Sequence, residues 1–263
     1  MTDTAHPAAS ADIFGLAGRR AVVVGGTGVL GGRFCEVLAA GGAEVVVAGR
    51  SAERGLAVVS QIESAGGAAV FVDVDVTSRD SVQDLAATVE ADGGADVLVN
   101  AAGVNSSTAF GDLTDAEWDR LLAVNVSSVF KTIQAFAPQL ARKPGSSVIN
   151  VSSASSGPPL SRVLGYGVAK AGVNNLTQYL ARELAPQGIR VNALVPGFFP
   201  AEQNRALLSA DRIADIVRHT PMGRLGEAHE LDGALLWLAS SRASGFVTGA
   251  LIRVDGGFSA MSI

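Results

Sequence analysis

Short apolar runs alternate with amphipathic stretches along most of the chain. The first run, Ala21 to Val24, is followed by a helical pattern over Val29 to Ala40 and by a second run over Glu44 to Ala48. Further β-branched runs, each bounded by Gly, Asp, Asn or Pro, are predicted to be strands: Ala69 to Val72, Val97 to Asn100, Ser147 to Val151, Arg190 to Leu194 and Ala250 to Val254. These strands lack polar alternation, so both faces of their sheet must be covered. The pattern predicts a doubly wound α/β fold of the Rossmann type, with a single parallel sheet and helices on both faces.

No linker or shift in composition divides the chain, so we expect one domain over residues 13–263, after a polar leader of residues 1–12 that we expect to be disordered. One connection, at about residues 197–221, is longer than the alternation of strands and helices requires. Its portion from Gln203 to Arg218 has a helical pattern with an apolar face. We interpret this connection as a helical insert over the ligand cleft, with an ordinary surface excursion as the alternative.

Composition and charge exclude several classes of protein. Hydrophobic residues make up 48% of the chain and charged residues 17%, a balance typical of a folded protein with a substantial core. The net charge is -5 and Lys and Arg form no run, so we expect no nucleic-acid partner, because phosphate binding requires clustered cations. We expect no membrane span, because Ser, Pro or Gly interrupts every long uncharged stretch. Cys35 is the only cysteine, and the chain's start lacks a signal-peptide pattern, so a reducing, cytoplasmic location fits best.

A glycine-rich segment, Gly25-Gly-Thr-Gly-Val-Leu-Gly31, joins the first predicted strand to the first predicted helix. Glycines at such a turn let backbone N–H groups approach a pyrophosphate, which then lies at the positive end of the helix dipole. We interpret the segment as a dinucleotide-binding turn. A purely structural turn is the alternative.

The end of the second predicted strand bears on which dinucleotide is bound. Arg50 lies about twenty residues after the glycine turn, where an acidic residue would bind the ribose 2′-hydroxyl. An arginine instead offers paired donors for a 2′-phosphate, so NADP(H) is favoured over NAD(H). The alternative is a solvated arginine at a helix start. Asp75, expected to close the third strand, is placed to face the adenine, with a turn or helix cap as its alternative role.

Three residues predict a catalytic site. Tyr166 and Lys170 are four residues apart at the start of a predicted helix, so their side chains project from one face. We expect the ammonium to lower the pKa of Tyr166 from its usual ~10 toward a value useful for general acid–base chemistry. Ser153, at the carboxyl end of the fifth predicted strand, is placed to orient a carbonyl oxygen toward Tyr166. Ser152 is the competing hydroxyl, and we expect it to be packed or capping.

Together and in this order, the motifs resemble those of the short-chain dehydrogenase/reductases, and the resemblance covers roughly Leu16 to Ser259. It is carried by the glycine turn, the three catalytic candidates and these further residues: Asn100-Ala-Ala-Gly103, Asn125 and Pro196-Gly197. The resemblance implies hydride transfer between NAD(P)(H) and a ketone or secondary alcohol. It also implies that Asn125 completes a catalytic tetrad by holding a water that relays protons to Lys170. A helix kink is the alternative role for Asn125, and a turn is the alternative for Asn100.

The cofactor-binding residues expected from these motifs lie in the glycine turn, after the second, third, fourth and sixth strands, and on the catalytic helix. They are Gly25, Thr27, Gly28, Val29, Leu30, Gly31, Arg50, Ser51, Asp75, Val76, Asn100, Ala101, Gly103, Tyr166, Lys170, Pro196, Gly197 and Phe199. The glycine turn departs from the family's T-G-x-x-x-G-x-G pattern at Val24 and Val29, which puts its backbone path in question. The resemblance also implies a homotetramer with the long helices and the last strand at its interfaces, and the sparse histidines predict no metal site.

The C-terminal third more narrowly resembles the branch of D-mannonate oxidoreductases or fructuronate reductases, which act on keto sugar acids. This likeness is carried by Pro196 to Arg205, His219 to Gly226, Ala234 to Leu238 and Val254 to Ser259. Pro200-Ala201 departs from that pattern, so the substrate specificity can differ.

A sugar-acid substrate requires partners for its carboxylate and hydroxyl groups. The candidates are Arg162, Gln203, Asn204 and Arg205, with a solvated helix face as their alternative. The alternative functions are a gluconate 5-dehydrogenase-like enzyme, a 3-oxoacyl-thioester reductase, a reductase of bulky ketones and a non-enzymatic NADP sensor.

Overall fold

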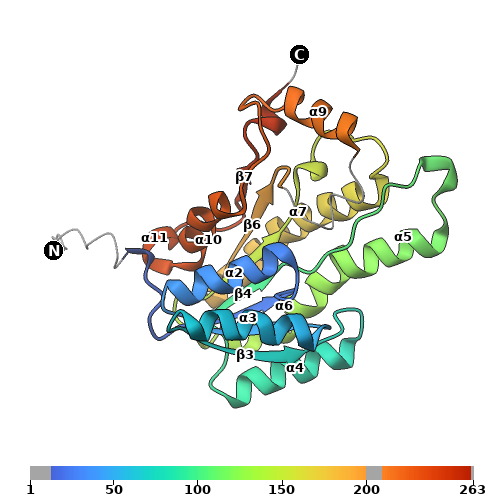
Figure 1. Ribbon diagram of the computed structural model, residues 1–263. Helices are drawn as coiled ribbons and strands as arrows, with labels where there is room; N and C mark the ends of the chain where they lie inside the picture. The colour runs from blue at the N-terminus through green and yellow to red at the C-terminus, as the bar shows by residue number, and fades with distance from the viewer. Residues whose placement is uncertain (1–12, 200–208, 262–263) are drawn as a thin grey trace.

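The computed structural model describes residues 13–199 and 209–261. Within them the strands form one seven-stranded parallel sheet, in the order β3-β2-β1-β4-β5-β6-β7 (Figure 1). The strands are β1 (Arg20–Val24), β2 (Glu44–Gly49), β3 (Ala68–Asp73), β4 (Val97–Asn100), β5 (Ser147–Val151), β6 (Arg190–Pro196) and β7 (Leu251–Val254). The order reverses between β1 and β4, and a ligand crevice in such a sheet lies at that reversal, beyond the carboxyl ends of the strands.

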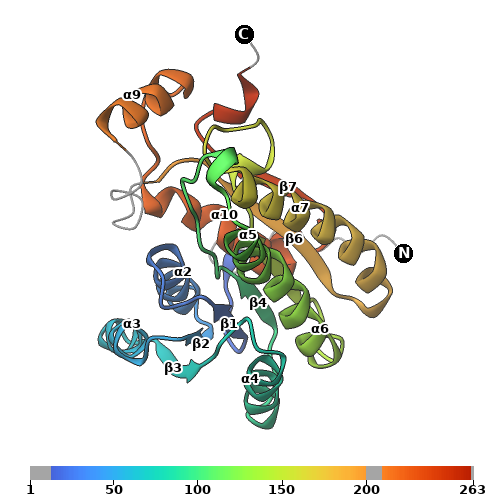
Figure 2. The same cartoon turned by 90° about the vertical axis from the view of Figure 1, so that its right-hand side faces the viewer.

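Helices cover both faces of the sheet (Figure 2). Side chains of α2 (Val29–Ala40), α3 (Ala52–Ser64) and α10 (Asp232–Ala239) belong to the core on one face. Those of α4 (Arg79–Ala91), α6 (Ser128–Leu140) and α7 (Leu164–Leu184) belong to the core on the other. The remaining helical elements are η1 (Phe110–Asp112), α5 (Asp115–Leu122), η2 (Ala123–Ser127), η3 (Ala154–Ser156), η4 (Ala185–Gln187), α9 (Ala210–His219), η5 (Ala228–Leu231), α11 (Ser241–Ser244) and η6 (Phe258–Ala260). The predicted fold class is confirmed.

The element boundaries follow from local chemistry. β1, β4, β5 and β6 are buried along almost their whole length, which explains why they lack polar alternation. Hydroxyl side chains of Ser51, Ser78 and Thr114 cap the starts of α3, α4 and α5. The third strand ends at Asp73, so Asp75 does not close it, contrary to the prediction, and lies in the following turn.

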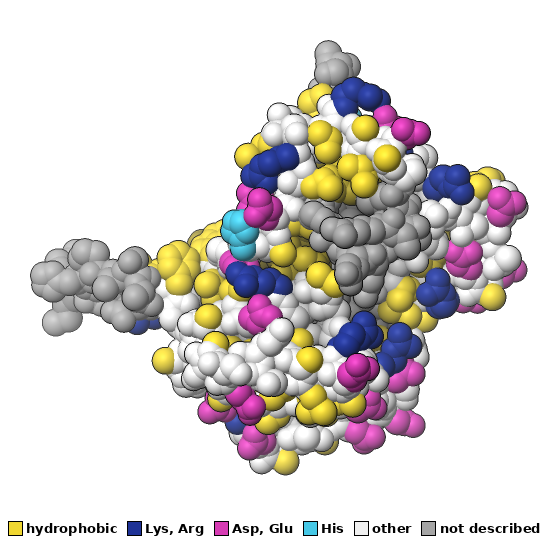
Figure 3. Space-filling model, viewed as in Figure 1, with side chains coloured by type: hydrophobic (Ala, Val, Ile, Leu, Met, Phe, Trp, Pro, Cys, Tyr) yellow, Lys and Arg dark blue, Asp and Glu magenta, His cyan; other side chains and the backbone are white. Residues whose placement is uncertain are grey.

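The predicted helical insert falls partly outside the described residues. Its described part is α9, which is capped by Ser209 and buries Ile216. This helix stands apart from the sheet as a lobe on which apolar side chains gather (Figure 3). On the same face, Lys and Arg side chains alternate with Asp and Glu and form no continuous basic surface. Within the described residues, no helix combines the length and apolar character needed to cross a membrane.

A buried chain of hydrogen bonds runs from α6 to α7 along one face of the sheet, near the carboxyl ends of β4 and β5. Thr132 of α6 donates to Asn100 Oδ1 at 2.7 Å, and Asn100 Nδ2 donates to Asn150 Oδ1 at 2.9 Å. Asn150 Nδ2 then donates to Thr177 of α7 at 2.9 Å. These four side chains are almost completely buried, so each bond satisfies a polar group that water does not reach. The chain therefore fixes α6 and α7 relative to the strand ends that carry the candidate site.

Candidate active site

The glycine turn is packed too tightly for side chains at two positions. Gly25 has φ +91°, and a Cβ atom there would lie 2.4 Å from Ala102 N. A Cβ atom on Gly31 would lie 2.0 Å from Gly25 O. The turn therefore brings its backbone against the ends of β1 and β4, leaving a surface of bare main chain.

The start of α2 presents free backbone donors at this surface. Gly28 is its N-cap, and within the described residues no side chain caps the helix and no acidic residue occupies its first turn. The N–H groups of Val29, Leu30 and Gly31 are therefore available to an anion at the positive end of the helix dipole. An exposed main chain with unpaired N–H donors is suited to binding a pyrophosphate. Val24 and Val29, where the sequence departs from the family's glycine pattern, do not disrupt this arrangement.

The second strand ends beside the turn. A Cβ atom on Gly49 would lie 2.5 Å from Thr27 Oγ1, so Thr27 packs directly on that strand end. Arg50 follows and is exposed, and its guanidinium makes no hydrogen bond or ion pair among the described residues. Ser51 caps α3, whose N-terminus opens next to Arg50.

Asp75 lies close enough to Arg50 for the two charges to interact. The Asp75 carboxylate accepts hydrogen bonds from the hydroxyl and the backbone N–H of Thr77, at 2.7 and 2.9 Å. These bonds hold the pKa of Asp75 below its ordinary value, and the positive charge of Arg50 adds to the effect. Asp75 therefore has the turn geometry that we considered as its alternative role, and the side chain of the next residue, Val76, is buried.

The segment after β4 is held by Asn125. This residue lies in η2, a π-helical turn between α5 and α6, and is completely buried. Its Nδ2 donates to Val104 O at 2.8 Å and to Leu121 O at 2.9 Å, and its Oδ1 accepts from Val104 N at 3.2 Å. The amide thus ties the helix irregularity to the loop, which is the kink role that we considered as the alternative.

Gly103 leaves a space between two of the predicted catalytic groups. A Cβ atom at Gly103 would lie 2.9 Å from Asn125 Oδ1 and 3.6 Å from Lys170 Nζ. Both polar atoms therefore face the same point. The neighbouring Asn100 supports the central strand through its buried bonds to Thr132 and Asn150 rather than forming a turn.

Ser153, Tyr166 and Lys170 come together beyond the carboxyl end of β5. Ser153 is the N-cap of η3, and its hydroxyl accepts from Ser155 N at 3.1 Å and lies near enough to the Tyr166 hydroxyl to favour the phenolate form. Lys170 is 4% exposed; its Nζ donates to Val151 O at 2.7 Å and lies 5.6 Å from the Tyr166 ring centre. Ser152 is buried and donates to Lys170 O at 3.2 Å, which is the packing role expected for it.

The pKa of Tyr166 differs from the expectation. Burial raises this pKa above its ordinary value, and the hydrogen bond to Ser153 only partly opposes the shift. Burial also lowers the pKa of Lys170 to about 8. The effect of burial on Tyr166 therefore outweighs the stabilisation that we expected from the Lys170 ammonium, whose Nζ donates to Val151 O. The phenol is therefore protonated at neutral pH, which suits a proton donor.

The last cofactor candidates follow β6. Gly197 N donates to Val254 O at 2.9 Å, and a Cβ atom at Gly197 would lie 2.7 Å from Asp255 Cα. Phe199 is buried against Gly226. This turn after Pro196 is thus fixed to the end of β7, and it lies on the same sheet edge as the catalytic residues.

Of the substrate candidates, only Arg162 lies within the described residues; Gln203, Asn204 and Arg205 lie outside them. Arg162 has φ +66° and is the only non-glycine residue with a positive φ in the described part of the chain. Its Nε donates to Ser107 O at 3.1 Å, which joins the loop before α7 to the loop after β4. The hydrogen bond between Asn174 of α7 and Ser156 of η3 has no signal in the sequence, because no spacing rule links a helix residue to a distant loop.

Comparisons with known proteins bear on this arrangement. A family model described as "Enoyl-(Acyl carrier protein) reductase" matches residues 28–259. The chain is 38% identical to the uncharacterised oxidoreductase UxuB of Bacillus subtilis, over 94% of this chain and 97% of that protein. It is 36% identical to the gluconate 5-dehydrogenase of Gluconobacter oxydans, over 96% and 97%. The chain belongs to the short-chain dehydrogenase/reductase family. It is therefore an oxidoreductase of this family that uses NAD(P).

Solved structures of other family members share the fold. A gluconate 5-dehydrogenase from Burkholderia cenocepacia, in complex with NADP and tartrate, is 32% identical with a TM-score of 0.92, covering 97% of this chain and 100% of that one. A Haemophilus influenzae protein with bound NAD, described as a candidate D-mannonate oxidoreductase, is also 32% identical with a TM-score of 0.90, covering 96% and 99%. The two structures hold different nicotinamide cofactors, so family membership alone does not choose between them.

Proposed function

We propose that this enzyme reduces the ketone of a keto sugar acid, such as fructuronate, with NADPH. The observation that supports this proposal most directly is that Ser153, Tyr166 and Lys170 lie together at one edge of the sheet. The glycine-rich turn of Gly25 to Gly31 lies at the same edge. The names of the relatives that act on gluconate and its keto derivatives support a sugar-acid substrate.

The catalytic residues have separate tasks in this proposal. NADPH, when bound, supplies the hydride that is transferred to the carbonyl carbon. Ser153 donates a hydrogen bond to the carbonyl oxygen and holds it toward Tyr166. Tyr166, protonated at neutral pH, transfers its proton to that oxygen as the C–O double bond becomes a single bond, so the product is the secondary alcohol. The reverse reaction oxidises the alcohol through the same groups.

Lys170 and Asn125 would restore the proton on Tyr166. Lys170 Nζ and Asn125 Oδ1 face the space left by Gly103, where a water would accept from one group and donate to the other. Oδ1 already accepts from Val104 N, and its second lone pair remains for this water. Lys170 is also placed to bind the nicotinamide ribose through its remaining N–H groups.

The cofactor preference rests on Arg50. NADPH differs from NADH only in a 2′-phosphate, and Arg50 with the N-terminus of α3 offers that phosphate a guanidinium fork and open backbone donors. A 2′-phosphate bound here would lie near the Asp75 carboxylate and be repelled by it. The positive charge of Arg50 must therefore also offset this repulsion. We therefore propose NADP(H) as the preferred cofactor.

Arg162 is the proposed partner of the substrate carboxylate. Its left-handed backbone costs about 1–2 kcal/mol in an L-residue, and such strain is concentrated at functional sites. Since its Nε is bound to Ser107 O, its two terminal nitrogens are oriented together and make no hydrogen bond within the described residues. This pair matches the geometry of a carboxylate.

The direct test is a spectrophotometric screen at 340 nm with NADPH and NADH in parallel. The substrates are fructuronate, 5-ketogluconate, other keto sugar acids, acetoacetyl thioesters and neutral ketones. We expect turnover of keto sugar acids with NADPH, and an Arg162→Ala variant should raise KM for the acids but not for a neutral ketone. Turnover of thioesters or neutral ketones alone would overturn the sugar-acid assignment.

Gluconate 5-dehydrogenase activity is the second candidate, since relatives with that activity match this chain as well as the candidate mannonate oxidoreductase does. The same panel separates the two candidates. Faster turnover of 5-ketogluconate than of fructuronate would favour the second.

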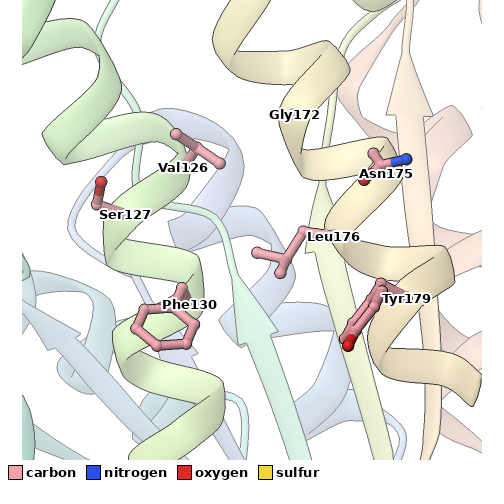
Figure 4. Close-up of a pocket in the computed structure, with 7 residues that line it drawn as sticks. All are labelled: Val126, Ser127, Phe130, Gly172, Asn175, Leu176 and Tyr179. Carbon is pink, nitrogen blue, oxygen red and sulfur yellow. The ribbon is translucent and has the colours of Figure 1, made fainter. Parts of the chain in front are cut away.

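We further propose a cytoplasmic homotetramer. An open groove of about 400 Å³ runs between η2–α6 and α7 (Figure 4). Its lining includes Phe130 and Tyr179, whose side chains are 43% and 59% exposed, and apolar area of this kind is typical of a surface covered by another subunit. Multi-angle light scattering should give four chains for the wild type and fewer for Tyr179→Glu.

A further inference from the structure

A short hydrogen-bond path runs from α7 to the loop that carries Ser153. Asn174 lies on α7 one turn after Lys170, and its Nδ2 donates to Ser156 Oγ at 2.8 Å. Ser156 Oγ in turn donates to Ser153 O at 2.6 Å. A hydroxyl has a single hydrogen. Ser156 Oγ therefore accepts a hydrogen bond from Asn174 and donates its own hydrogen bond to the Ser153 carbonyl, so the direction of the path is fixed.

Ser153 has few other side-chain restraints. It stands where β5 ends, and backbone turns hold the three residues after it: Ser156 N donates to Ser153 O at 3.0 Å and Gly157 N donates to Ala154 O at 3.3 Å. Beyond them the chain runs through the exposed residues 157–159. Besides the contact of the Ser153 hydroxyl with Tyr166, the bond through Ser156 ties this turn to α7.

The hydrogen bonding of Asn174 is not what the stability of the fold alone would favour. Its Oδ1 is buried and has no partner in the described residues. A buried amide oxygen without a hydrogen bond is unfavourable for folding, so an apolar side chain of similar size would suit the packing better. The Nδ2 atom, in contrast, donates a hydrogen bond to the Ser153 loop, at Ser156 Oγ.

We propose that Asn174 is a positioning residue that acts through Ser156 to fix Ser153 against Tyr166. The proposal rests on the catalytic role proposed above for Ser153. In the wild type, the Ser153 hydroxyl meets the Tyr166 hydroxyl and, in the reaction, the carbonyl oxygen. Without the path, the serine turn shifts relative to α7 and the two hydroxyls no longer converge on one oxygen.

The sharpest test replaces Ser156 by two side chains of equal shape. Ser156→Thr keeps the hydroxyl and Ser156→Val removes it. The kcat of each variant is measured with the best substrate of the screen and saturating cofactor. We expect Ser156→Thr to retain the wild-type kcat and Ser156→Val to lower kcat about three- to tenfold, the effect of one lost hydrogen bond. Asn174→Leu should lower kcat similarly, and combining it with Ser156→Val should lower it no further. The dissociation constant of the cofactor, measured by NADPH fluorescence, should stay unchanged.

A Ser153→Ala background distinguishes positioning from a general structural effect. There, Asn174→Leu should change kcat less than twofold, because the residue that it positions is gone. Gln178→Ala, an exposed change one turn further along α7, is the control in both backgrounds. An undiminished effect of Asn174→Leu in Ser153→Ala, or equal kcat for Thr and Val at position 156, would overturn the proposal. If Asn174→Leu fails to fold, the position-156 pair decides. If Ser153→Ala alone retains full activity, the proposed role of Ser153 fails instead.

Discussion

Replacing Arg50 with alanine tests how the enzyme chooses its cofactor. Arg50 is exposed and, within the described residues, no hydrogen bond holds its guanidinium, so its removal leaves no buried partner unsatisfied. We therefore expect the free energy of unfolding to change by less than about 0.5 kcal/mol. Any large change in cofactor binding then reports on Arg50 itself.

The expected magnitude follows from the surroundings of the phosphate site. A hydrogen bond to a charged group contributes about 1.5–3 kcal/mol, which is about 10- to 150-fold in a dissociation constant. The loss should be partial because the N-terminus of α3 and Ser51 remain. It should approach the upper end at low salt, because removing Arg50 also exposes the phosphate to the ionised Asp75.

Fluorescence titration of NADPH and NADH onto wild type and Arg50→Ala measures the effect directly. NADPH should bind about 10- to 150-fold more weakly to the variant, while NADH binding stays within about twofold. Arg182→Ala, an exposed arginine in the last turn of α7, is the charge-matched control. Equal weakening of both cofactors, or no weakening of NADPH, would refute the assignment of Arg50 to the 2′-phosphate.

Three further predictions concern the catalytic residues. Tyr166→Phe should lower kcat by about 10²- to 10⁴-fold, the usual contribution of a general acid, and leave cofactor binding unchanged in the same titration; near-normal turnover would contradict the mechanism. Burial lowers the pKa of Lys170 from 10.5 to about 8, so between these values the unfolded chain binds more protons and the free energy of unfolding of the wild type rises with pH. Lys170→Met should remove this rise, which amounts to about 2.4 kcal/mol between pH 7.5 and 10, and urea titrations at these two pH values check it; the same slope in both proteins would exclude Lys170 as its source. Gly103→Ala should place a methyl group between Asn125 and Lys170 and lower kcat at saturating cofactor at least about tenfold, whereas a rate equal to the wild type would mean that no proton passes through this space.

Local sequence patterns were sufficient to predict the helices and strands and to identify Tyr166 and Lys170. The helix predicted over Val29 to Ala40 has those same ends, because a glycine turn starts it and Gly41 follows it. The strand predictions succeeded because the strands are short, apolar and bounded by turn residues, and this held even for the edge strands β3 and β7, which are not fully buried. Tyr166 and Lys170 lie on one helix, so their proximity follows from helix geometry alone.

Features that depend on tertiary contacts were beyond sequence reasoning. The π-helical turn at Asn125 arises because its amide takes the Leu121 carbonyl and the distant Val104 backbone, and neither contact leaves a periodic signal. The pKa of Tyr166 was predicted in the wrong direction because the spacing to Lys170 says nothing about how deeply the phenol is buried. Side-chain directions and desolvation are set by the packed structure.

The architecture separates the chemical step from substrate recognition. Besides the contact of Ser153 with Tyr166, four hydrogen bonds join α7 to β5 and the turn after it: Asn150 to Thr177, Ser152 to Lys170, Lys170 to Val151 and Asn174 to Ser156. Three of these hydrogen bonds are buried: two join α7 to β5 itself and the third joins α7 to Ser152, directly after the strand, so neither element can shift without breaking them. Arg162, in contrast, is carried by an exposed loop and held by a single bond to Ser107 O. Changes at Arg162 should therefore alter KM and the choice of ketone, while the approach of Ser153 to Tyr166, and with it the proton transfer, stays the same.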